Sequence, residues 1–181
     1  SGKVYYSPIT NTRDTQLLDL WEAEAGFGPF YLHPIDVVYS EDPVDQQIER
    51  AMKRLTGVLP KFGRAVEEAL VHVRKNVSPV PKGSYVLVSD DTRVRFLPLG
   101  CALVGYGQYS DIEDNLIIDL TVGESVTVTD EAALWVHEAV YKVLRDTKDE
   151  PDSYNTRRIV ALMFSNRVLI RSELENGFPK K

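Results

Sequence analysis

Apolar residues recur at helical spacing after a start signal near position 42. Asp42 and Pro43 form a capping residue followed by a proline at the first helical position, and apolar residues then recur every three or four positions until Gly57. A second segment with one apolar face follows Pro60, and His72 lies beside that face. The pattern predicts two amphipathic helices in this part of the chain.

The middle of the chain is typical of β-structure. Residues 84–89 and 93–97 flank three turn-forming residues, so we expect them to form a hairpin. Residues 101–109 and 115–120 are two further strand candidates. Because helices and strands come in separate runs, the expected fold class is α+β, with a small, mostly antiparallel sheet flanked by helices.

Two more helices are predicted after the strands. Thr129 is a suitable N-cap, with acidic residues in the first turn where the helix dipole favours them, so we expect a helix over 130–146. After the polar loop KDEPDS, Asp152 or Ser153 is expected to cap a last helix that reaches Ser165.

The domain organisation follows from these elements. Residues 1–40 are rich in aromatic residues, proline and glycine, and they are predicted to form an extended N-terminal arm with a short helix at 15–25. Residues 41–175 are expected to form a single α+β domain, and residues 176–181 a flexible tail. A chain of 181 residues is long enough for one such domain with its own core.

Composition restricts the partners and the compartment. The net charge of −6 leaves no basic face for phosphates, which argues against nucleic acid as a partner. No apolar run approaches the roughly 20 residues of a membrane helix, so no integral membrane segment is expected. Cys101 is the only cysteine, which excludes an intramolecular disulfide and a Cys-rich zinc site. The chain starts with Ser-Gly instead of Met, which we interpret as a cloning scar where a signal peptide was left off.

The helix over 130–146 carries the first half of a metalloprotease motif. His137 and Glu138 open the pattern H-E-x-x-H, in which two histidines one turn apart hold zinc and the glutamate activates water. Tyr141 stands where the second histidine belongs. At about 100° per residue, His137 is expected at the border between core and solvent, with Tyr141 stacked one turn later and Glu138 towards the polar side, paired with Lys142. A catalytic zinc needs three protein ligands and an open fourth position, and two of those ligands would have to come from carboxylates or remote histidines.

The last helix adds an arginine to this picture. Arg158 lies at the edge of the apolar stripe, and it is expected to reach Glu138 if the two helices pack as an antiparallel pair. A Glu–Arg pair in such a place is more often an architectural clamp than part of a catalytic site. The candidate site therefore comprises His137, Glu138, Tyr141 and Arg158, as a binding site or the remnant of a catalytic one, with no metal or other cofactor expected.

These helices resemble a family of exported proteins from predatory and related Gram-negative bacteria. The likeness rests on VHEAVYKVLRD followed by DSYNTRRIVALMFS, with the upstream strands GCALVGY and NLIIDL, and it covers residues 60–165. The resemblance implies a domain encoded behind a signal peptide, and it assigns no activity. The order of helix, small sheet and H-E helix is also similar to the minimal zincin layout, from which this chain departs at Tyr141.

We therefore expect an exported protein, periplasmic or secreted, with a degenerate zincin-like domain. Its expected role is non-catalytic, either binding a peptide or an envelope polymer or serving as a structural component of the cell envelope. As a binding module it should have a groove lined by Tyr106, Tyr109 and Tyr141. The alternative is a zinc-dependent hydrolase or peptidase, in which His137 is a metal ligand and Glu138 the general base.

Overall fold

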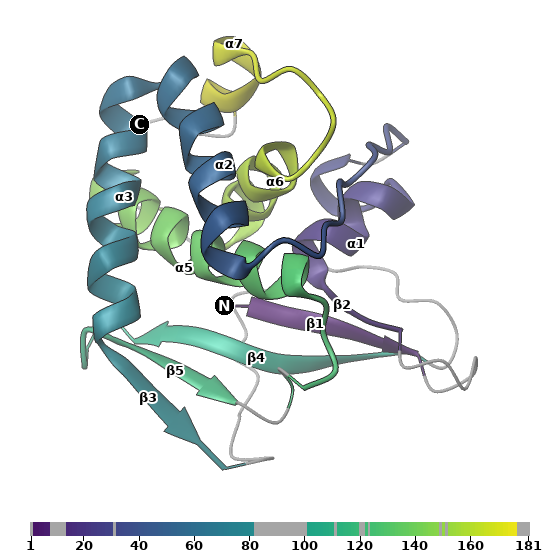
Figure 1. Cartoon of the computed structure of the whole chain (residues 1–181), viewed down its shortest axis with the longest axis vertical. Helices are drawn as coiled ribbons and strands as arrows, with labels where there is room; N and C mark the ends of the chain where they lie inside the picture. Colours follow the sequence, from purple (N-terminus) through teal and green to yellow (C-terminus); the bar gives the residue numbers. More distant parts are fainter. Residues whose placement is uncertain are drawn as a thin grey trace.

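In the part of the chain that the structure describes, five strands form one sheet, and the helices lie over one face of it (Figure 1). The computed structural model describes residues 2–7, 14–30, 32–81, 101–110, 112–119, 122, 124–148, 150 and 152–176. The hairpin predicted at 84–89 and 93–97 lies outside these residues. The strands are β1 (Gly2–Ser7), β2 (Asp14–Leu17), β3 (Val77–Val80), β4 (Ala102–Ser110) and β5 (Asn115–Asp119).

The strand order is β2-β1-β4-β5-β3, and all pairings except the last are antiparallel. The pairs β1–β2 and β4–β5 are neighbours in the sequence and pair antiparallel, whereas β3 follows the end of a helix and pairs in parallel with β5. The α+β class and the mostly antiparallel sheet that the sequence predicts are confirmed. The zincin-like arrangement remains a prediction.

The helices predicted after position 42 are all present. They are α2 (Val44–Val58), α3 (Pro60–Lys75), α5 (Val128–Lys148) and α6 (Tyr154–Met163), accompanied by α1 (Leu18–Ala25), the 3-10 turn η1 (Gly28–Phe30) and α7 (Arg171–Glu175). Among the described helices, none combines the length and the apolar character needed to cross a bilayer.

The prediction of an extended arm over residues 1–40 is wrong. Its first part forms β1 and β2, and β1 pairs with β4 in the middle of the sheet. The short helix expected at 15–25 is α1, which ends at Gly26 in the left-handed conformation with φ +67°. Leu17, Leu18 and Leu20 are at most 1% exposed, so the apolar residues of this segment belong to the core.

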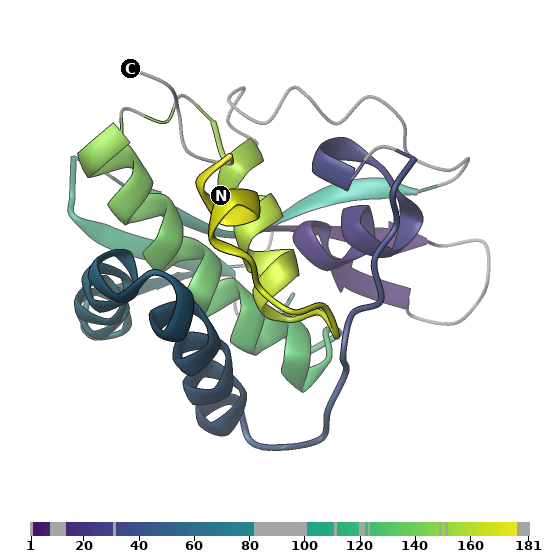
Figure 2. The same cartoon turned by 90° about the horizontal axis from the view of Figure 1, so that it is seen from above.

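Helix α5 is the central element of the helical layer. In Figure 2 it runs between the pair α2 and α3 on one side and the helices α6 and α1 on the other, with the sheet below. Every residue from Val136 to Tyr141 is buried. A run longer than one helical turn covers all directions around the axis, so this part of α5 is enclosed on every side.

The start of α5 differs from the prediction by two residues. The hydroxyl oxygen of Thr127 accepts a hydrogen bond from the Asp130 amide at 3.1 Å, and the Asp130 carboxylate in turn accepts one from the Thr127 amide at 3.1 Å. This reciprocal pair is a capping box, and Thr127 is therefore the N-cap. Thr129, the predicted cap, lies inside the helix with its hydroxyl 2.9 Å from the Gln47 amide oxygen.

Candidate functional site

His137 lies in the interior of the molecule instead of at its border with solvent. Its ring is fully buried, and Nδ1 lies 2.6 Å from Oδ2 of Asp19, which is also buried. A carboxylate bound to one ring nitrogen fixes the orientation of an imidazole and the position of its proton. Because Asp19 belongs to α1, the partner of His137 comes from the segment that the sequence predicts to be an arm.

The predicted stacking of Tyr141 on His137 is present, but the predicted tyrosine groove is not. The two rings are 6.4 Å apart between centroids and inclined by 22°. Tyr106, Tyr109 and Tyr141 are only 3%, 5% and 6% exposed, so these rings pack inside the molecule and do not line an open groove.

Glu138 binds the sheet and does not lie on the polar side of α5. Its carboxylate is fully buried, and Oε2 accepts a hydrogen bond of 3.2 Å from the amide of Tyr109 in β4. The pairing of β4 with β1 ends at Gly107, so Glu138 satisfies a strand amide just beyond that end. A Cβ at Gly107 would lie 3.6 Å from Oε1 of Glu138, which shows how closely the strand approaches the helix here.

The buried arginine of α6 is Arg157, not Arg158. The guanidinium of Arg158 donates to the backbone carbonyl of Glu173 at the edge of the fold. Nε of Arg157 lies 2.7 Å from Oε2 of Glu22 on α1, and its Nη1 donates to the Ser153 hydroxyl at 2.8 Å. The predicted Glu–Arg clamp thus exists with two different residues, and it joins α6 to α1.

Glu150, between α5 and α6, caps the N-terminus of α6. Its Oε1 accepts hydrogen bonds from the amides of Asn155 and Thr156 at 3.0 and 3.2 Å, in the first turn of α6. The side chain is fully buried, and Oε2 has no hydrogen-bond partner among the described residues. Burial raises the pKa of this carboxyl to about 7, although the two amides and the nearby His137 favour its ionised form.

These contacts define a junction cluster between α1, α5 and α6. Its ionisable members are Asp19, Glu22, His137, Glu150 and Arg157, and none of them is more than 1% exposed. No three His, Cys, Asp or Glu side chains within the described ranges are grouped to hold a metal ion. The cluster joins three helices through contacts between buried polar side chains.

Sequence reasoning missed every partner of His137 in this cluster. One signal was present, because Asp19 and Glu22 are three residues apart within an otherwise apolar stretch. Acidic residues at this spacing share one face of a helix, so a buried cationic partner was to be expected for them.

Gly28 packs directly against the Glu22 carboxylate of the Glu22–Arg157 pair and leaves no space for a side chain. It has a φ of +51°, and an added Cβ would lie 2.4 Å from Oε1 of Glu22. We expect Gly28→Ala to lower the free energy of unfolding by about 1–3 kcal/mol, because it adds backbone strain and displaces a buried carboxylate. Urea denaturation measures this loss, and the control Gly57→Ala, where an added Cβ meets no atom within 4 Å, should not be destabilising. Equal stability of the two variants would contradict the expectation.

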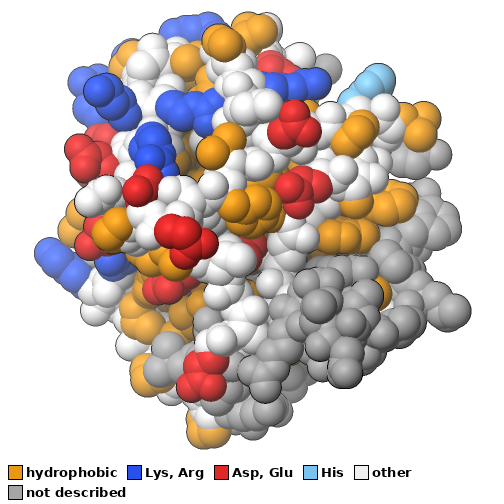
Figure 3. Space-filling view, turned by 45° about the vertical axis from the view of Figure 1, so that its right-hand side comes forward, with side chains coloured by type: hydrophobic (Ala, Val, Ile, Leu, Met, Phe, Trp, Pro, Cys, Tyr) orange, Lys and Arg blue, Asp and Glu red, His pale blue; other side chains and the backbone are white. Residues whose placement is uncertain are grey.

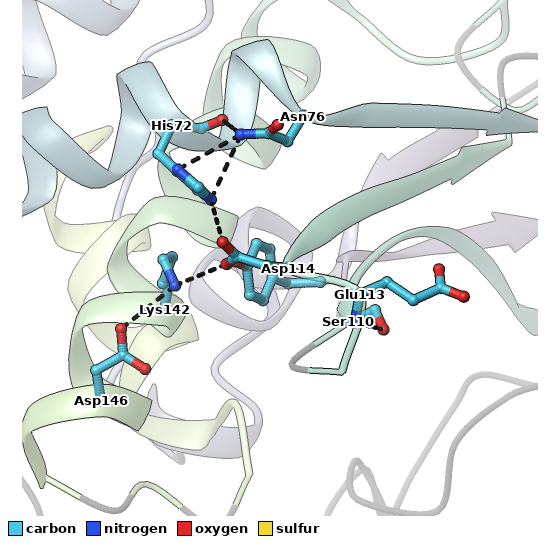
Figure 4. A network of polar contacts seen from close by, with 8 residues as sticks. His72, Asn76, Ser110, Glu113, Asp114, Lys142 and Asp146 are labelled. Carbon is cyan, nitrogen blue, oxygen red and sulfur yellow. Dashed lines mark hydrogen bonds and ion pairs between the residues drawn. The ribbon is translucent and has the colours of Figure 1, made fainter.

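A second polar network lies at the exposed end of α5 (Figure 4). Asp114, in the turn between β4 and β5, lies 3.0 Å from Nε2 of His72 and 3.2 Å from Nζ of Lys142. Lys142 also lies 3.4 Å from Asp146, so the predicted pairing of Lys142 with Glu138 is replaced by exposed partners. The network connects the β4–β5 turn to α3 and α5, but pairs this open to solvent contribute little to stability.

Comparison of the chain with protein-family models, curated proteins and solved structures finds no match.

Proposed function

We propose that this chain is a non-catalytic binding or structural domain, in which the H-E pair of α5 is part of the architecture. The observation that carries the proposal is the complete burial of His137 and Glu138, each bound to an internal partner. A general base must come within hydrogen-bonding reach of a water or a substrate, and a catalytic zinc keeps an open position for one. Two fully enclosed side chains are poorly suited to either task.

The partners of the pair also favour an architectural role. His137 joins α5 to α1, and Glu138 joins α5 to β4, so adjacent residues attach the central helix to two different elements. Replacing either side chain would leave a buried polar partner unsatisfied, which costs about 1–3 kcal/mol. Residues of this kind are needed in a fold whether or not it catalyses a reaction.

The proposed place of this domain is the cell envelope, with a peptide or an envelope polymer as ligand. The support is the resemblance of its two motif helices to those of exported proteins. A periplasmic or secreted location follows from the same resemblance.

Zinc analysis separates this proposal from a zinc-dependent hydrolase. The full chain and the variant His137→Gln are incubated with excess zinc, dialysed and analysed for bound metal, with circular dichroism to confirm folding. We expect the two proteins to retain the same substoichiometric amount. One zinc ion per chain in the unaltered protein, lost in the variant, would support the hydrolase alternative and contradict the proposal.

A further inference from the structure

We propose that a cavity between α2, residues 36–40 and the end of α6 binds a ligand with a free carboxylate next to a small apolar group. This inference extends the proposed binding role, on which it rests, by naming a ligand class and a site. The cavity has a volume of about 200 Å³. A cavity of about 150 Å³ accommodates benzene, so the space suits one small chemical group.

The walls of this cavity are of two kinds. One part is apolar, formed by Val38, Ala51, Met163 and Phe164, and the other is polar, formed by Gln47, Arg50, Arg54 and Ser165. A mostly apolar surface with a few converging polar groups is typical of small-ligand sites.

Backbone contacts hold the two sides of the cavity together. The amide of Val38 donates to the carbonyl of Phe164 at 2.8 Å, and the amide of Asn166 donates to the carbonyl of Asp36 at 3.1 Å. Residues 36–38 therefore run alongside the chain that leaves α6, and the cavity does not depend on a single side chain for its shape.

Arg54 is a cation without an anionic partner among the described residues. Its guanidinium donates to the backbone carbonyls of Met163, Ser165 and Arg167. Carbonyl groups orient the guanidinium but do not neutralise its charge, and its remaining N–H groups have no acceptor within the described part of the chain. Burial lowers the pKa of Arg54, as expected for a charge that has lost water without gaining a carboxylate.

Arg50 supplies a second positive charge one turn earlier on α2. Its Nη1 lies 2.7 Å from Asp42, and about half of each side chain is exposed. With two guanidinium groups and one carboxylate, the cavity mouth retains a net positive charge. Basic side chains also gather over the helical layer in the upper part of Figure 3. The groups around the cavity thus favour an anion, and arginine binds a planar carboxylate in a bidentate manner.

The apolar wall then limits which carboxylates fit. Ala51 and Met163 are 3% and 1% exposed, so a group placed against them is removed from water. Two sources have this chemistry: the C-terminus of a peptide that ends in a small apolar residue, and a free short-chain carboxylic acid.

Calorimetric titration of the full chain tests the site. The probes are N-acetyl-alanyl-alanine with a free C-terminus, the same dipeptide as its C-terminal amide, and isovalerate. We expect saturable binding of the free acid. The amide should bind at least about tenfold more weakly than the free acid, because it lacks the charge that accepts the hydrogen bonds. Tighter binding of the dipeptide than of isovalerate would assign the site to a peptide C-terminus, and the opposite order to a free acid; either result supports a carboxylate site.

Three variants locate the binding in this cavity. Arg50→Gln, at an exposed position, should weaken binding about tenfold. Ala51→Leu should abolish it by filling the space, with thermal denaturation as a check on folding. Lys53→Gln removes one positive charge from α2 outside this cavity and should leave affinity unchanged.

Two results would overturn the inference: no saturable binding of either carboxylate at millimolar concentration, or binding that persists unchanged in both Arg50→Gln and Ala51→Leu. The zinc analysis above is a separate measurement, so a failure here leaves the proposed non-catalytic role standing, and the two failures can be told apart.

Discussion

Replacing Arg157 by methionine is expected to lower the free energy of unfolding by about 3–5 kcal/mol. Arg157 and Glu22 are each 1% exposed, and their side chains meet at 2.7 Å. Removing the arginine leaves a buried carboxylate without its counter-charge, and the penalty for that group exceeds the net value of the ion pair. Urea denaturation, followed by circular dichroism, measures the difference.

The matched control is Arg158→Met on the same helix. Arg158 is partly exposed and donates to one backbone carbonyl, so its loss is expected to cost only about 1 kcal/mol. In the double variant Glu22→Leu with Arg157→Met, much of the lost stability should return because both charges are gone. A loss in Arg157→Met no larger than in Arg158→Met would show that the junction cluster does not join α1 to α6 as described.

Local sequence signals were sufficient to predict the helices whose start is marked by a proline. Pro60 is the first residue of α3, and Pro43, predicted as the first residue of α2, is its N-cap, one position earlier. The apolar spacing behind each proline persists to the end of the helix. The β4 and β5 strands were likewise predicted from apolar runs between turn residues. Such signals lie within a few residues of the structure that they specify.

The candidate site depended on contacts that no local signal reports. His137 meets Asp19 at a separation of 118 residues, and Arg157 meets Glu22 at 135. Helical periodicity assigns each residue to one face of a helix, which suits an element packed on one side only. Because α5 is enclosed by helices on both sides and by the sheet, residues at a predicted border are fully buried. The prediction therefore placed His137 and Glu138 on a helix that is present but misjudged the environment of both side chains.

The same reliance on periodicity explains why Arg158 was predicted to pair with a glutamate, whereas Arg157 forms the buried pair. The two residues are about 100° apart around α6. The sequence placed Arg158 at the edge of the apolar stripe, where it is partly exposed, but did not predict that Arg157 is buried. An arginine in the interior is unexpected without a known partner, since charged side chains are rarely buried unless paired. Only the packing of α1 against α6 provides that partner.

Glu150→Gln is expected to make the fold more stable than the unaltered protein at alkaline pH. The pKa of the buried Glu150 carboxyl is raised to about 7 from the ordinary value of 4.5, so the folded chain holds this proton more tightly than the unfolded chain. The resulting stabilisation is fully present below about pH 4.5, falls as the pH rises, and is lost above about pH 7. Across this range the unaltered protein should lose about 3 kcal/mol relative to the variant.

Urea denaturation at a series of pH values from 5 to 8.5 tests this, because the difference in unfolding free energy between the two proteins should grow with pH and then level off. Glutamine keeps an oxygen for the amides of Asn155 and Thr156, so the variant preserves the cap of α6 while removing the titration. Glu113→Gln is the matched control, since that side chain is exposed and points away from the network in Figure 4. A pH-independent difference for Glu150→Gln, like that expected for Glu113→Gln, would mean that Glu150 is ionised in the fold and that its environment is less dry than its full burial implies.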